Sequence, residues 1–153
     1  MKFPKELFIP VSISFLSLVF SLVILPFISL NLFHNPRIAE LGVLEAWTIW
    51  DAPHYLDLAD SWYKSTGDDA FWIVFLPLFP ILVAVADFIP FFSILNSGFL
   101  IAAICALASS VVFYKLLRLD ENTIVSRFSV LSLFVFPTSF FLFLPYPESV
   151  FYF

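Results

Sequence analysis

Two long stretches of the chain carry no charged side chain, and they constrain its fold more than any other feature. The first runs from Leu7 to Phe33 and the second from Phe88 to Tyr114. A helix needs roughly 20 apolar residues, at about 1.5 Å of rise each, to cross a hydrocarbon core of about 30 Å. Both stretches exceed that length. They predict transmembrane helices over 7–33 and 96–117.

The composition also indicates a membrane protein. Hydrophobic residues make up 61% of the chain and charged residues 12%, whereas soluble domains carry about 25% charged residues. A cleaved signal peptide is the alternative for the first stretch, but its apolar region is about 7–15 residues long. The net charge of -5 without a basic run argues against a nucleic-acid partner.

The stretch from 34 to 70 is the main polar region and predicts an extracytoplasmic loop. Two short amphipathic helices are expected in it, from about Arg37 to Trp47 and from about His54 to Lys64. In the second, apolar side chains recur at helical spacing from Tyr55 to Trp62, opposite a charged face. The neighbouring tryptophans favour a position in the membrane interface.

The segment 71–92 is apolar but interrupted by Pro77 and Pro80. Its first sixteen residues, Phe71 to Ala86, reach only about 24 Å as a helix, so the segment is predicted either to re-enter or to form a second span. Re-entry places five of the seven Lys and Arg residues on the cytoplasmic side, as the positive-inside rule favours. A further span is expected over 124–144. The segment 145–153 then begins another element, so the chain is expected to be one incomplete membrane domain.

Asp51 is the strongest candidate for chemistry, because it lies among Trp47, Trp50 and His54. An Asp before Pro53 can cap the helix that follows. A partly desolvated carboxylate at the interface can instead accept a proton from a sugar hydroxyl. The two alternatives stay open at this stage.

Glu148 is the second candidate, within the string Pro145–Ser149 that also contains Tyr146. A carboxylate at the mouth of an apolar segment is costly and needs a partner or water. It can also be a first-turn acid stabilised by the helix dipole. The chain has only three glycines and no Gly-rich phosphate loop, which favours a lipid-phosphate donor over a sugar nucleotide.

Three strings in order resemble one known family. WDAPHYLDLADSWY starts at Trp50, FLPLFPIL at Phe75, and FPTSFFLFLPYPESVF at Phe136. Together they are similar to segments of the PIG-V-like (GPI mannosyltransferase 2) family, covering about Trp47 to the end. The chain resembles the N-terminal portion of such an enzyme.

The resemblance implies an all-α polytopic membrane protein with GT-C-like transmembrane helices. It also implies transfer of a hexose, mannose in that family, from a polyprenyl-phosphate-linked donor to a lipid or glycan acceptor, with inversion. The site would face the extracytoplasmic side of the plasma membrane in a prokaryote, or of the endoplasmic reticulum in a eukaryote. The expected partners are this donor, the acceptor and the lipid bilayer. No cofactor or metal ligand is expected, and a divalent metal is left open.

The expected residue roles follow from the same resemblance. Asp51 would be the general base and Glu148 a supporting carboxylate on the same face of the membrane. The expected substrate-binding residues are Trp47, Trp50, His54 and Tyr146. An inverted topology is rejected because it would separate the two acids.

A non-catalytic membrane module, such as a transporter fragment or an accessory subunit, is the alternative function. Transporters usually place ionisable groups near the bilayer midplane. Here the acids cluster in a loop beside aromatic residues. This distribution favours the interfacial enzyme.

Overall fold

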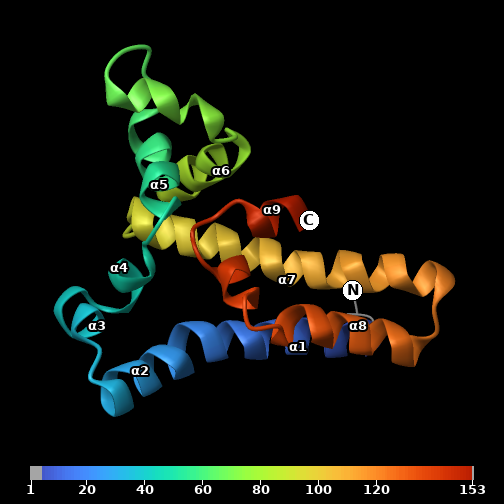
Figure 1. Ribbon diagram of the computed structural model, residues 1–153. Coiled ribbons are helices and arrows are strands. Elements are labelled where there is room, and N and C mark those ends of the chain that lie inside the picture. Colours follow the sequence, from blue (N-terminus) through green and yellow to red (C-terminus); the bar gives the residue numbers. More distant parts are fainter. Residues whose placement is uncertain (1–4, 153) are drawn as a thin grey trace.

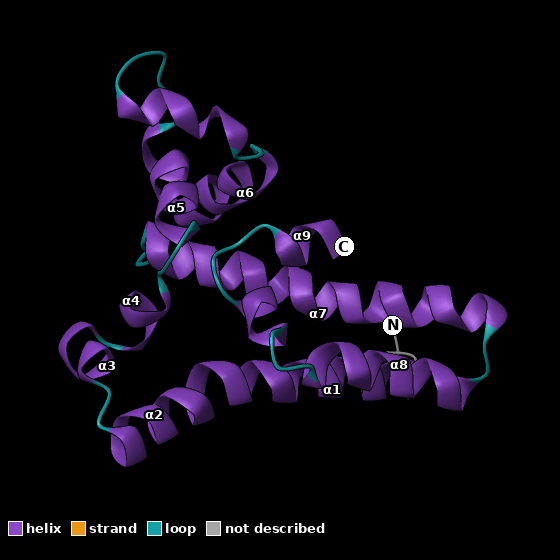
Figure 2. Cartoon of the chain, in the orientation of Figure 1, coloured by secondary structure: helices purple, strands orange, loops and turns teal. Residues whose placement is uncertain are grey.

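The computed structural model of the chain describes residues 5–152, and in that part all regular secondary structure is helical, without a strand (Figure 2). Two of its helices are long and apolar enough to cross a membrane, at Lys5–Phe33 and Ile94–Asp120. The predicted membrane α-helical class is thereby confirmed at this level. Large apolar side chains stay exposed along the first helix, including Phe8 (67%), Phe27 (66%) and Phe33 (76%). Such a surface fits contact with lipid rather than water.

The first long helix combines η1 (Lys5–Leu7), α1 (Phe8–Val19), η2 (Phe20–Ile24) and α2 (Leu25–Phe33). The element η2 is a π-helical turn just before the buried Pro26. Proline has no backbone N–H and crowds the preceding turn, so one wider turn lets the helix continue past it. The helix ends at His34, which takes the left-handed conformation with φ 48°.

The second long helix, α7 (Ile94–Asp120), runs alongside the first (Figure 1). It begins at Ser93, whose hydroxyl accepts a hydrogen bond from the Asn96 N–H. After a tight turn, α8 (Thr123–Val135) begins at Asn122, whose side chain accepts from Ile124 and Val125. The helix α8 packs back on α1 and α7.

The predicted span over 124–144 differs in the structure, because α8 ends at Val135. Pro137 follows, and the residue before a proline disfavours helical backbone, so the chain turns there. The segment then continues as the short η4 (Ser139–Phe143) and ends in α9 (Glu148–Tyr152). Thirteen residues of α8 reach only about 20 Å, which is short of the hydrocarbon core.

The polar region contains three short helices rather than the predicted two. Gly42, with φ 88°, divides the first into α3 (Pro36–Leu41) and α4 (Val43–Trp47). The second predicted helix is α5 (Ala52–Ser61), which ends before Lys64 because Trp62 leaves the helical region with φ 60°. The helix α5 packs against α6 and α7.

The proline-broken segment folds as η3 (Asp68–Val74) and α6 (Leu78–Asp87), with a 110° bend between them. This geometry is that of a broken span or of a re-entrant loop. Its outer surface is apolar, with Phe71, Ile73 and Val74 each at least 75% exposed. Figure 1 shows this hairpin beside α5, away from α8.

Candidate functional site

Asp51 lies at the N-terminal boundary of α5, on the exposed side of the chain. Its backbone takes the N-cap position, but its side chain accepts no capping hydrogen bond. Pro53 in the first turn brings no N–H that would need one. The side-chain capping role considered for Asp51 is therefore not present, and the carboxylate stays open to a ligand.

The backbone before Asp51 is held in an unusual conformation. Trp50 has φ 48°, a left-handed value that a bulky residue adopts at a cost of about 1–3 kcal/mol. Two hydrogen bonds to the Ile49 carbonyl hold it there, one from the Ala52 N–H and one from the Tyr146 hydroxyl. Tyr146 thus ties the C-terminal part of the chain to the Asp51 loop.

Glu148 begins α9, which packs on α7. The Ser109 hydroxyl donates a 3.1 Å hydrogen bond to the Ser149 carbonyl and so fixes this short helix. The Glu148 Oε2 atom is buried and has no hydrogen-bond partner among residues 5–152. Burial raises the pKa of Glu148, and the negative charge of Asp51 raises it further.

Asp51 and Glu148 lie far apart in sequence, but the negative charge of each raises the pKa of the same two tyrosines. Burial raises the pKa of Tyr55 to about 12, with further contributions from the charges of Glu148 and Asp51. Burial also raises the pKa of Tyr146 to about 12, and the same two carboxylates add to the shift. Two acids and two neutral phenols therefore share one electrostatic environment.

Gly98 on α7 lies where α5, which follows Asp51, and the segment before Glu148 both pack against α7. A Cβ atom at this position would lie 2.7 Å from Leu56 Cδ2, on α5, and 3.0 Å from Pro145 Cβ. A side chain here would require Leu56 or Pro145 to shift, so glycine lets both segments pack close to α7 without such a shift. The absence of a side chain at Gly98 thus brings the Asp51 helix and the Glu148 segment together.

Aromatic rings surround the acids. Trp50 is 65% exposed and its ring lies 5.5 Å from that of Phe141, while Trp47 lies 5.4 Å from Phe140. His54 packs between Trp72, at 5.1 Å, and Phe75, at 5.3 Å. These rings supply flat apolar surfaces of the kind on which sugar rings and lipid chains pack.

His54 does not orient Asp51 by hydrogen bonding in the described part of the chain. Its Nδ1 atom is buried without a partner, and no hydrogen bond joins it to the carboxylate. The ring packing against Trp72 and Phe75 fits an ordinary interfacial histidine, and the substrate-binding role of His54 stays a prediction. The Trp47 Nε1 atom is likewise buried without an acceptor.

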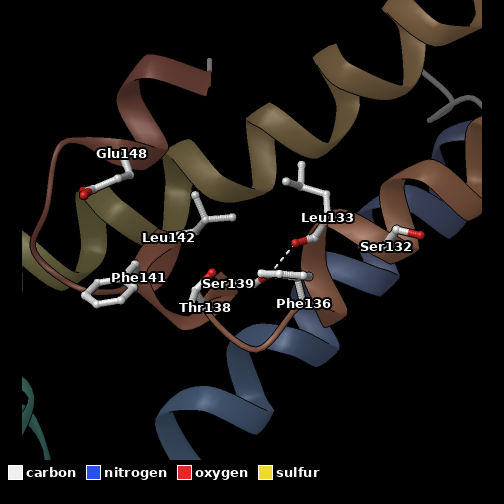
Figure 3. A pocket seen from close by; sticks show the side chains of 8 residues that line it. All are labelled: Ser132, Leu133, Phe136, Thr138, Ser139, Phe141, Leu142 and Glu148. Carbon is white, nitrogen blue, oxygen red and sulfur yellow. Dashed lines mark hydrogen bonds between the residues drawn. The ribbon is translucent and has the colours of Figure 1, made fainter.

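A cavity of about 560 Å³ adjoins Glu148. Phe141 and Glu148 lie toward one end of it, and Ser132 of α8 lies at the other (Figure 3). The Ser139 hydroxyl donates to the Leu133 carbonyl across the break after α8. Asp51 does not line this cavity, but Phe141 touches both the cavity and Trp50.

The sequence analysis missed Tyr55, Phe141 and Gly98. Tyr55 lies on the apolar face of its helix, where a tyrosine is ordinary, so no local signal distinguishes it. Among residues 5–152, no group of three His, Cys, Asp or Glu side chains is placed to hold a metal ion. No protein-family model, curated protein or solved structure matches the chain significantly.

Proposed function

We propose that the protein is a membrane glycosyltransferase that moves a hexose from a polyprenyl-phosphate-linked donor to a lipid or glycan acceptor. The observation that carries this proposal is the hydrogen bond that brings the two acids together: the hydroxyl of Tyr146, two residues before Glu148, donates to the carbonyl of Ile49, two residues before Asp51. An exposed carboxylate and a buried one beside aromatic surfaces suit a sugar that reaches the membrane edge.

Asp51 is the base in this proposal. As the acceptor oxygen attacks the anomeric carbon, its proton passes to the Asp51 carboxylate. The bond between that carbon and the phosphate oxygen breaks, and the electron pair leaves with the polyprenyl phosphate. Attack from the side opposite the leaving group inverts the anomeric centre.

Glu148 supports the reaction rather than taking the proton. Its Oε2 atom has no hydrogen-bond partner in the described chain, so the proposal assigns it a hydrogen bond with a sugar hydroxyl. Trp47, Trp50 and His54 provide contact surface, and Tyr146 holds the loop that carries Asp51. A GT-C-like arrangement of spans and an extracytoplasmic location belong to the same proposal.

The test is Asp51→Asn, compared with Asp60→Asn, which removes the same charge from an exposed position on the same helix. Both are expressed in membranes, and transfer from polyprenyl-phosphate mannose is measured. Loss of a general base lowers the rate by about 10²–10⁴-fold, so Asp51→Asn is expected to lose transfer by that factor. Asp60→Asn is expected to keep it.

Equal transfer by Asp51→Asn and the wild type would remove Asp51 as the base. A correctly inserted wild type that transfers no sugar from any polyprenyl-phosphate donor would contradict the proposal. It would favour the non-catalytic membrane module.

A further inference from the structure

A second cavity lies between the end of the first long helix and the segment that precedes Asp51. It measures about 400 Å³, within the range of small-molecule pockets. Leu25, Ile28 and Phe33 of α2 line it, together with Arg37 of α3, Trp47 of α4 and Ile49. We call it the Arg37 cavity.

Arg37 brings a positive charge that no carboxylate of the described chain neutralises. The only salt bridge within residues 5–152 joins Lys64 to Asp69. Arg37 donates from Nε to the Ala46 carbonyl at 3.1 Å and from Nη2 to the Thr48 carbonyl at 3.4 Å. A guanidinium has five N–H donors, so three remain for a ligand.

Trp47 adds an aromatic wall beside this charge. Its ring lines the Arg37 cavity, while its Nε1 atom is buried. The remaining lining is mostly apolar. The cavity therefore suits a molecule that combines an anionic oxygen group with hydrocarbon.

The position of the cavity points to the bilayer as the source of that molecule. The neighbouring turns of α2 expose Leu32 (71%) and Phe33 (76%), which is the surface expected to face lipid. Tryptophan and arginine at the end of a span lie at the depth of lipid headgroups. A phosphodiester carries one negative charge and so matches the single guanidinium. A phosphomonoester carries about -1.5 to -2 at pH 7 and would leave charge uncompensated.

We propose that the Arg37 cavity binds the phosphodiester headgroup of an anionic glycerophospholipid from the surrounding bilayer. The phosphate oxygens accept from the free Arg37 N–H groups, and the Trp47 ring packs against the headgroup. The acyl chains run along α2. This proposal does not depend on the proposed transfer chemistry, although Trp47 takes part in both.

The experiment titrates dioctanoyl phosphatidylglycerol into the detergent-purified chain and measures binding by calorimetry. Saturable binding is expected, and Arg37→Gln is expected to weaken it about tenfold or more, because charge-assisted hydrogen bonds are lost. The matched control is Arg118→Gln. Arg118 is also exposed and donates to a backbone carbonyl, that of Glu121, but at the far end of α7. It is expected to leave binding unchanged.

Two further variants keep the test decisive if Arg37→Gln lowers the melting temperature. Arg37→Lys retains the charge but loses the planar fork, and Trp47→Ala removes the ring that lines the cavity. Each is expected to weaken binding about three- to tenfold.

Equal binding by the wild type and all three variants would overturn the proposal. Equal binding of phosphate-free dioctanoylglycerol would assign the cavity to hydrocarbon alone and would also overturn it. If inorganic phosphate binds as tightly as the lipid, the acyl chains contribute nothing, and the cavity would be a phosphate site rather than a lipid site. Farnesyl phosphate binding more than tenfold tighter would assign the cavity to a polyprenyl phosphate instead. Retained lipid binding in Asp51→Asn is expected, and this separates the two proposals.

Discussion

Buried polar atoms occur both in the helix bundle of α1, α7 and α8 and in the candidate site around Asp51 and Glu148, but the two regions differ in how these atoms are hydrogen-bonded. In the bundle, the Ser14 hydroxyl bonds to Ser110 across α1 and α7 at 3.2 Å, and the Ser17 hydroxyl donates to the Phe134 carbonyl at 2.7 Å. Around the site, buried atoms of Trp47, His54 and Glu148 have no partner in the described chain. Paired polar atoms hold helices together, whereas unpaired ones are available to a ligand.

The bundle also contains buried polar atoms without a hydrogen-bond partner within residues 5–152. The Tyr114 hydroxyl and the Arg127 Nε atom are also buried without a partner. They belong to α7 and α8, far along both helices from Gly98, and no described cavity adjoins them. The site differs in that its unpaired atoms come with two carboxylates and two cavities.

Among the substitutions that distinguish the two regions, Gly98→Ala is expected to have the largest effect on stability. The new Cβ would press on Leu56 and on the rigid ring of Pro145, and such overpacking costs about 1–3 kcal/mol. The better helix propensity of alanine offsets about 1 kcal/mol of this cost, so a net loss of up to about 2 kcal/mol is expected. Unfolding measured by denaturant titration in detergent checks it. Sugar transfer should fall as well, because the two acids are pushed apart.

The double variant Leu56→Ala/Gly98→Ala is the control for this effect. Removing the Leu56 side chain relieves the 2.7 Å contact, so the double variant should lose less stability than the two single losses added together. Strictly additive losses would show that Gly98 is not the meeting point of the two segments.

The membrane spans could be predicted from sequence because the absence of charge over a fixed length is a local property. The runs 7–33 and 96–117 predicted the helices Lys5–Phe33 and Ile94–Asp120 within a few residues. The helix within the segment 124–144 ends early, at Val135, for a reason that an average over hydropathy does not detect. Pro137 removes one backbone donor and restricts Phe136, so a continuous apolar run still breaks at Val135. Gly42 divided the first predicted loop helix in the same way.

The candidate acids could also be selected from sequence, but not their surroundings. Asp51 and Glu148 stand out because charge is rare in this chain. Tyr55 and Gly98 could not be selected, because a tyrosine on an apolar helix face and a glycine within a span are ordinary. Their importance comes from contacts between α5, α7 and the 145–148 segment, which no local pattern encodes.

The second expected effect concerns pH and Glu148. Its pKa in the folded chain is raised by burial and by Asp51 above the ordinary value of 4.5. The folded state therefore holds this proton more tightly than the unfolded state does. The resulting stability is fully present below pH 4.5 and is lost as the pH rises through the raised pKa. Glu148→Gln cannot ionise and does not lose this stability. The melting temperature of the variant should therefore rise relative to that of the wild type as the pH increases.

Melting curves at a series of pH values above and below 4.5 check this expectation, with Glu40→Gln as the control. Glu40 is exposed on α3, so its removal should leave the pH dependence unchanged. A parallel pH dependence in Glu148→Gln and the wild type would mean that Glu148 is solvated in both states. In that case it would not form part of a desolvated acid pair.

The smallest expected effect is Ser14→Ala in the bundle. The Ser14 hydroxyl bonds to Ser110 and to the Val11 carbonyl, but Ser110 keeps its own 2.7 Å bond to the Leu107 carbonyl when Ser14 is removed. No group of Ser110 is left without a partner, and hydrogen bonds between membrane helices average about 0.6 kcal/mol. A loss of about that size is expected in detergent unfolding. Ser132→Ala, which removes an exposed bond within α8, should cost less. A loss above about 2 kcal/mol for Ser14→Ala would mean that the bundle depends on its polar contacts as strongly as the site does, and the contrast between the two regions would disappear.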